Sequence, residues 1–196
     1  MVATVNVEEG NGAGPTWTVI TSGRYCTRDA YNPGDNDPCV VPTAGFNYSY
    51  WKSHRIAWTG IGTKISDIYW YTSGNVATNW TPGTGGGLFV GVKAAPATCS
   101  GCPTASYDQA AGTAGETGYN MDDVTDGHTF YKSGTANYNA PVNADTYVSA
   151  TPLYVDDTEY TTNTHSNHVV TQVKLFIDAT QGDKASETMS FRYSEI

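Results

Sequence analysis

The chain has 196 residues and a formal net charge of −9, and only 15% of its residues are charged. This length suits one domain with a substantial core, and its aromatic and β-branched residues are too plentiful for a disordered chain. Acidic residues outnumber basic ones by 19 to 10 without a basic cluster, so we expect no nucleic-acid partner. No run approaches about 18 apolar residues, so we expect no membrane partner.

Alternation of apolar and polar residues predicts β-strands along most of the chain. In chain order the predicted strands are 2–7, 16–21, 55–59, 65–72, 88–93, 129–132, 146–153, 169–178 and 187–193. Helical spacing is scarce, and the best helix candidate, 106–116, is interrupted by glycines that weaken it.

Two pairs of these strands predict hairpins. Strands 55–59 and 65–72 are separated by a short glycine-containing link. Strands 169–178 and 187–193 flank the segment 180–184, which supplies the turn residues Gln-Gly-Asp.

Together these elements predict a single all-β domain over residues 1–196. We expect an antiparallel β-sandwich, jelly-roll-like or of another Greek-key topology. Long loops are predicted near 26–45, 82–87 and 94–127, where turn residues dominate.

The four cysteines, Cys26, Cys39, Cys99 and Cys102, are disulfide candidates. A Cys26–Cys39 bond would close a loop and stabilise the fold by about 3 kcal/mol. The spacing leaves all three disulfide connectivities open. Zinc is an alternative, but only Cys99 and Cys102 form the CxxC knuckle that a four-thiolate site needs twice. Free thiols are the third alternative.

Other ligand candidates lie in loops. Asp122, Asp123 and Asp126 supply hard oxygen atoms of the kind that calcium prefers, although solvated loop acids explain them as well. No other cofactor is predicted. His165 and His168 lie three apart before a strand, where extended backbone would point them to opposite sides. We therefore expect surface or strand-end histidines rather than a metal pair.

The tryptophans suggest a core and a binding candidate. Trp58 and Trp70 have alternating neighbours and are predicted to lie in the core, whereas Trp80 lies in a loop and could stack on a sugar. A carbohydrate-binding module or lectin is therefore one alternative function. We expect no enzyme, because the chain lacks a GxSxG motif and offers few glutamates for a facing carboxylate pair.

Three segments together carry a family resemblance. They are NYSYWKSHRIAWTGIGTKISDIYWYTSG (47–74), PATCSGCP (96–103) and HVVTQVKLFIDATQGDKASETMSFRYSEI (168–196). This combination resembles structural proteins encoded by tailed phages and related mobile elements. The resemblance implies a β-sandwich virion component, with a capsid decoration (cement) or surface protein favoured over the larger, helix-containing major capsid protein.

The leading hypothesis is thus a virion protein that binds the capsid lattice and stabilises the particle. Its expected partners are the major capsid protein or other virion proteins, and copies of itself, with a trimer as the guess. Strands at both ends of the chain would join a neighbour's sheet, through Val2, Thr4, Val5, Val7, Met189, Phe191 and Tyr193. Deleting residues 1–8 is then expected to weaken assembly more than the fold.

A self-assembling extracellular filament or pilus-like subunit that exchanges strands is a further alternative. Residues 1–12 show no signal-peptide pattern, which favours synthesis in a host cytoplasm and a place in the virion. An extracellular location is the alternative.

Overall fold

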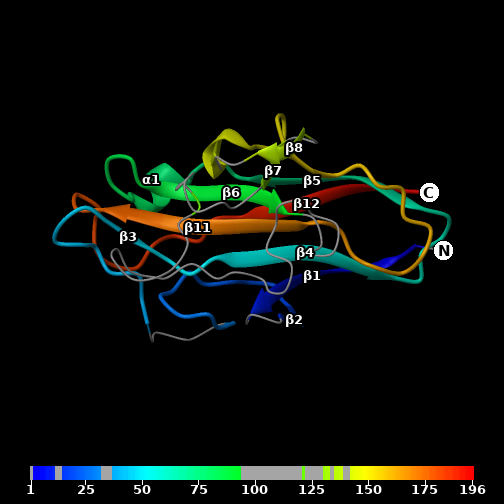
Figure 1. The fold of residues 1–196 in the computed structure, drawn as a ribbon, viewed down its shortest axis with the longest axis horizontal. Coiled ribbons are helices and arrows are strands. Elements are labelled where there is room, and N and C mark those ends of the chain that lie inside the picture. The colour runs from blue at the N-terminus through cyan, green and yellow to red at the C-terminus, as the bar shows by residue number, and fades with distance from the viewer. Residues whose placement is uncertain are drawn as a thin grey trace.

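The structure is a computed structural model that describes residues 2–11, 15–31, 37–93, 121, 130–132, 135–138 and 142–196. The protein is all-β, with two antiparallel sheets that pack as a sandwich (Figure 1). This confirms the predicted fold class.

The larger sheet has the strand order β2-β1-β4-β11-β6-β7-β8. Two short strands join it from the side, because β3 pairs with β11 and β9 pairs with β6. Its strands are β1 (Thr4–Asn11), β2 (Thr16–Val19), β3 (Phe46–Tyr48), β4 (Lys52–Thr59), β6 (Gly87–Lys93), β7 (Phe130–Lys132), β8 (Thr135–Tyr138), β9 (Val142–Asn143) and β11 (His168–Phe176).

The smaller sheet has three strands in the order β10-β5-β12. They are β5 (Ile65–Thr72), β10 (Leu153–Asp156) and β12 (Met189–Glu195). The short helix α1 (Val76–Trp80) and the 3-10 turn η1 (Ala144–Thr146) complete the regular structure of the described residues. No helix in the described ranges is long and apolar enough to cross a membrane.

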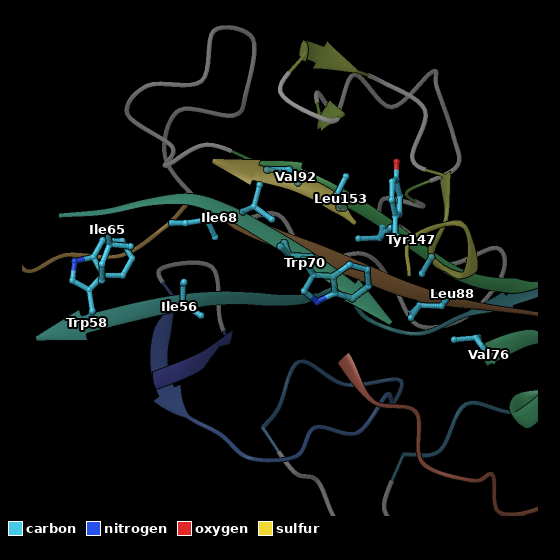
Figure 2. Close-up of a cluster of buried hydrophobic side chains, with 14 of the residues drawn as sticks. Ile56, Trp58, Ile65, Ile68, Trp70, Val76, Leu88, Val92, Tyr147 and Leu153 are labelled. Atoms are coloured by element: carbon cyan, nitrogen blue, oxygen red, sulfur yellow. The ribbon is translucent and has the colours of Figure 1, made fainter. Parts of the chain in front are cut away.

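The core lies between the two sheets. Side chains from both sheets fill it, including Trp58 on β4 and Trp70 on β5, which are almost fully buried. Figure 2 shows labelled side chains of this core, from Trp58 and Ile65 at the left to Leu88 and Val76 at the right. The prediction that Trp58 and Trp70 are core residues is confirmed.

Strand β11 is buried on both faces over its first half. Val169 and Val173 face the core between the sheets, whereas Val170 belongs to a second cluster with Trp51 and Met121 on the outer side. Two buried faces explain why valines occur at consecutive positions, Val169 and Val170, at the start of this strand.

Both predicted hairpins are wrong. β4 pairs with β1 and β11 in the larger sheet, whereas β5 pairs with β10 and β12 in the smaller one. In the same way, β11 and β12 belong to opposite sheets. Alternation identifies a strand with one apolar face, but it does not specify whether the next strand lies beside it or about 10 Å away across the core.

Two local predictions also fail. The strand predicted at 146–153 is a turn closed by a bridge between Val148 and Thr151, and the real strand, β10, begins only at Leu153. Helix α1 was not predicted, and it ends where Thr81 adopts a left-handed backbone with φ of 44°. The helix candidate 106–116 lies outside the described residues.

The predicted loop at 82–87 is present up to the start of β6. Gly86 is required there, because a Cβ atom would lie 2.3 Å from the Pro82 carbonyl oxygen and 2.7 Å from that of Lys174. This close approach lets the loop pass directly against β11.

Candidate assembly surface

One flank of the sandwich leaves strand edges unpaired. Strand β2 pairs with the half of β1 from Glu8 to Asn11, and the Ile20 N–H that follows it bonds to the Val7 carbonyl, so Thr4–Asn6 pairs with a strand on one side only, with β4. Strand β12 pairs with β5 alone among the strands that the structure describes. We call these two open edges, Ala3–Asn6 and Met189–Glu195, the β1–β12 flank.

The two edges lie close together although they come from opposite ends of the chain. The backbone N–H of Ala3 donates a hydrogen bond to the Glu195 carboxylate, 2.6 Å away. Both chain ends lie at the same end of the molecule (Figure 1). The flank therefore offers one edge of each sheet on the same side of the sandwich.

The alternation of an antiparallel ladder shows which backbone groups are open. The N–H of Trp58 bonds to the Thr164 carbonyl, away from β1, so Trp58 and its partner Val5 form a non-hydrogen-bonded pair. The N–H and C=O of Val5 therefore point outward. The same argument applies to β12. The N–H of Thr72 bonds to the Tyr147 carbonyl, away from β12, so Thr72 and Met189 form a non-hydrogen-bonded pair. Phe191, two residues along β12, has the same parity, and its backbone N–H and C=O therefore point outward.

The flank also exposes part of the core. Val5 and Val7 on β1, and Met189, Phe191 and Tyr193 on β12, are partly buried and pack against the central cluster. Open backbone groups above a half-covered apolar seam are what an added strand from another chain needs. A bulge between Arg192 and Ser194 interrupts the β12 ladder, so the regular part of its edge runs from Met189 to Arg192.

The predicted assembly residues thus lie on this flank or next to it. Val2 is 83% exposed just before β1, and the others belong to the two edge strands. The expectation for the deletion of residues 1–8 stays a prediction. Because this segment contains Ala3 in the core and the part of β1 that pairs with β4, its removal would also cost stability.

A buried ionic cluster lies at the other end of β1. The Lys52 ammonium contacts Glu9 Oε1 at 2.8 Å and the Ala30 carbonyl at 2.6 Å, while His54 Nε2 lies 3.5 Å from Glu9 Oε2. Burial alone would raise the pKa of Glu9, but the adjacent His54 and the Lys52 charge outweigh it and lower this pKa.

Sequence reasoning missed this cluster, although a signal was present. Glu9 continues the inward register of Val5 and Val7, just as Lys52 continues the register that leads to Trp58. A charged residue at an inward position of each of two paired strands indicates a buried ion pair.

Through its bond to the Ala30 carbonyl, Lys52 holds the segment that contains Tyr25 and Ala30, which covers the neighbouring part of the gap between the sheets. In this segment, the Tyr25 hydroxyl lies 2.7 Å from Thr171 Oγ1 and 3.8 Å from the Met189 sulfur. Glu9 and Lys52 are almost fully buried, so they offer no charged group to a solute outside. We therefore assign them a structural role.

The described cysteines are free thiols. Cys26 donates a hydrogen bond to the Arg28 carbonyl, and burial together with Cys26 raises the pKa of Cys39 to about 12. The candidate Cys26–Cys39 disulfide is not formed in the structure, although the bridge partner of Cys26 is Pro38, next to Cys39. Cys99 and Cys102 lie outside the described residues.

The histidine pair is arranged differently from the prediction. His168 opens β11 and is only 5% exposed, and its ring lies 5.7 Å from that of His165 and 4.9 Å from that of Trp17. Burial, with the nearby His165, Arg55 and Lys93, lowers the pKa of His168 to about 3. The strand-end position was predicted correctly, but His168 is not on the surface and the rings do not point apart.

The structure does not assemble a metal site from the residues that it describes, since no group of three suitable ligands occurs there. The calcium candidates Asp122, Asp123 and Asp126 lie outside these residues.

Trp80 is not the freely exposed side chain that its loop context predicted. Its indole N–H donates to the Ala185 carbonyl at 2.8 Å, and its ring meets Tyr25 edge to face. These contacts fix Trp80 against the core and leave less of its ring to stack on a sugar.

Comparisons of the chain with protein families, with curated proteins and with solved structures found no match.

Proposed function

We propose that this protein is a structural subunit that joins a larger protein assembly through the β1–β12 flank. The observation that carries the proposal is the pair of adjacent open edges above a half-covered apolar seam. Adding a strand to either edge satisfies backbone groups such as those of Val5 and Phe191 and buries the seam at the same time.

The assembly that we propose is a virion surface, with the chain as a capsid decoration or surface protein. The resemblance of segments 47–74, 96–103 and 168–196 to tailed-phage structural proteins supports this choice, as does a surface poor in charge. The partners would be the major capsid protein or other virion proteins and further copies of this chain. The protein would then be made in the host cytoplasm and reside in the particle.

Quantitative proteomics of particles from the source material, fractionated on a density gradient, tests this proposal. A virion subunit co-migrates with the most abundant capsid protein at a fixed, high ratio. Absence of the chain from the particle fractions would contradict the virion role.

The same edges support a second candidate, an extracellular filament subunit that exchanges strands between copies. Electron microscopy of the purified chain separates the two candidates. Fibres formed by the chain alone would favour the filament, whereas a soluble chain that binds added particles would favour the decoration protein.

A further inference from the structure

The outer face of the smaller sheet carries a row of two tyrosines and an arginine across its three strands. Tyr154 on β10 pairs with Tyr69 on β5, which pairs in turn with Arg192 on β12. The two phenol rings lie 5.0 Å apart between centroids, and the Arg192 guanidinium lies 4.9 Å from the Tyr69 ring. Tyr71, two residues along β5, lies on the same face.

Two exposed carboxylates adjoin this row. Asp67 lies in β5 with a left-handed backbone, φ of 52°, at the level where the pairing with both neighbouring strands shifts register. Asp157 follows the last residue of β10 and is also exposed. Burial, then the charge of Asp157, then Tyr69 and Asp67 raise the pKa of Tyr154, which places both carboxylates within electrostatic reach of its hydroxyl.

We propose that this tyrosine face, made of Asp67, Tyr69, Tyr71, Tyr154 and Asp157, binds a basic segment of a protein partner. No lysine, arginine or histidine in the described part of the chain forms an ion pair with Asp67 or Asp157. Cations from outside are thus the groups that complement the face in charge.

The face already shows the contact that it would make with a partner. Arg192 lies over one side of the row at Tyr69, where a guanidinium meets the negative face of an aromatic ring. At the other side, Tyr154 lies beside two carboxylates, and no cation among the described side chains lies over its ring. A lysine or arginine there would combine a cation–π contact with an ion pair.

A neutral glycan is the main competing occupant, because sugars also stack on tyrosine rings. The carboxylates favour the basic segment, since their charge strengthens binding to a cation and gives it a salt dependence that a neutral ligand lacks. The face lies on the outer side of the smaller sheet and does not use the open backbone groups of the β1–β12 flank. A variant can therefore lose binding at one of the two surfaces and keep binding at the other.

The test is titration of the full chain, followed by NMR, with a blocked heptapeptide that alternates lysine and serine. Its counterpart with glutamate in place of lysine and a neutral hexose oligosaccharide are titrated in parallel. We expect the lysine peptide alone to shift the resonances of the tyrosine face, with binding that weakens as salt rises from low to physiological levels.

Variants locate the contact. The double variant Asp67→Asn and Asp157→Asn should weaken lysine-peptide binding about tenfold, because each lost ion pair contributes a modest, additive share. Asparagine tolerates the left-handed backbone at position 67, so the fold should persist, and an unchanged melting temperature verifies it. Tyr31→Ala, at an exposed tyrosine elsewhere, is the matched control and should bind normally.

Equal binding by the double variant and the wild type would overturn the proposal. So would the absence of lysine-peptide binding at low salt, or saturable binding of the oligosaccharide in its place.

Discussion

The last two strands of the larger and smaller sheets, β11 and β12, follow each other in sequence but differ in almost every structural respect. β11 is paired on both sides and buried on both faces over its first half. β12 is paired on one side, and none of its residues is fully buried. Both have apolar residues at alternate positions, so their difference arises from position in the sheet rather than from strand propensity.

This contrast distinguishes residues that stabilise the fold from residues whose backbone and side chains can still bind another chain. A strand that is buried on both faces and paired on both sides has few groups left to offer, because its backbone bonds to two neighbours and its side chains are covered. An edge strand keeps open backbone groups and a partly exposed apolar seam. Mutations should therefore affect stability at β11 and association at β12 and the open half of β1.

The largest expected effect is on the stability of β11. Val173→Asp would place an unpaired carboxylate in the core and should cost at least about 4 kcal/mol in the free energy of unfolding. Ser190→Asp on the outer face of β12 should change it by less than about 0.5 kcal/mol. Urea unfolding measures both, and similar losses in the two variants would remove the contrast between the strands.

The buried ion pair at the closed half of β1 should come next. Lys52→Met leaves Glu9 buried without its cation and should destabilise the fold by about 3–5 kcal/mol. The double variant Glu9→Gln and Lys52→Met should recover most of this loss, because no unpaired charge remains. A double variant as unstable as the single one would contradict a structural role for the pair.

An intermediate effect depends on pH at the start of β11. The pKa of His168 is about 3 in the folded chain, against 6.5 for the free side chain, so the unfolded chain binds more protons between these values. Stability is therefore present above about pH 6.5 and should fall by about 1.4 kcal/mol per unit as the pH drops toward 3.

Replacing the imidazole tests this dependence. His168→Gln should flatten the fall in unfolding free energy between pH 6.5 and 5, a window above the range in which Glu9 titrates. His165→Gln, which keeps the buried ring of His168, should retain the slope. An unchanged slope in His168→Gln would show that other groups govern it.

The smallest effect on stability, and the largest on association, is expected at the open edge of β1. Val5→Pro removes an outward N–H that bonds to no strand in the described residues, so it should cost far less than Asn6→Pro, whose N–H faces β4. If the partner strand adds to β1, gradient sedimentation with particles should show Val5→Pro folded but unbound. Normal binding by this variant would exclude this edge from the interface.

The sequence could predict strands because side-chain alternation is local information. The bounds of β5 match the predicted 65–72, and Trp58 and Trp70 lie in the core as expected. Partner choice could not be predicted, since β4–β5 and β11–β12 cross between sheets through links that would equally suit hairpins. Sheet membership is decided by packing across the core, which is not visible in a window of residues.

The candidate surface could be predicted only in part. The edge strands were named from their position near the chain ends, but the sequence could not show that β12 and the first half of β1 lie on one flank. The buried partners of Glu9 and the inward turn of Trp80 depend on contacts with residues 43 and 105 positions away along the chain. Such contacts leave no local pattern.

Amide hydrogen exchange of the free chain and of the chain within its purified assembly is the most direct test of the assembly role. In the free chain the amides of Val5 and Phe191 should exchange quickly, while those of Thr4 and Asn6, which face β4, should be protected. In the assembly, strand addition should also protect Val5 or Phe191. If both amides exchange as fast in the assembly as in the free chain, the β1–β12 flank is not the docking surface.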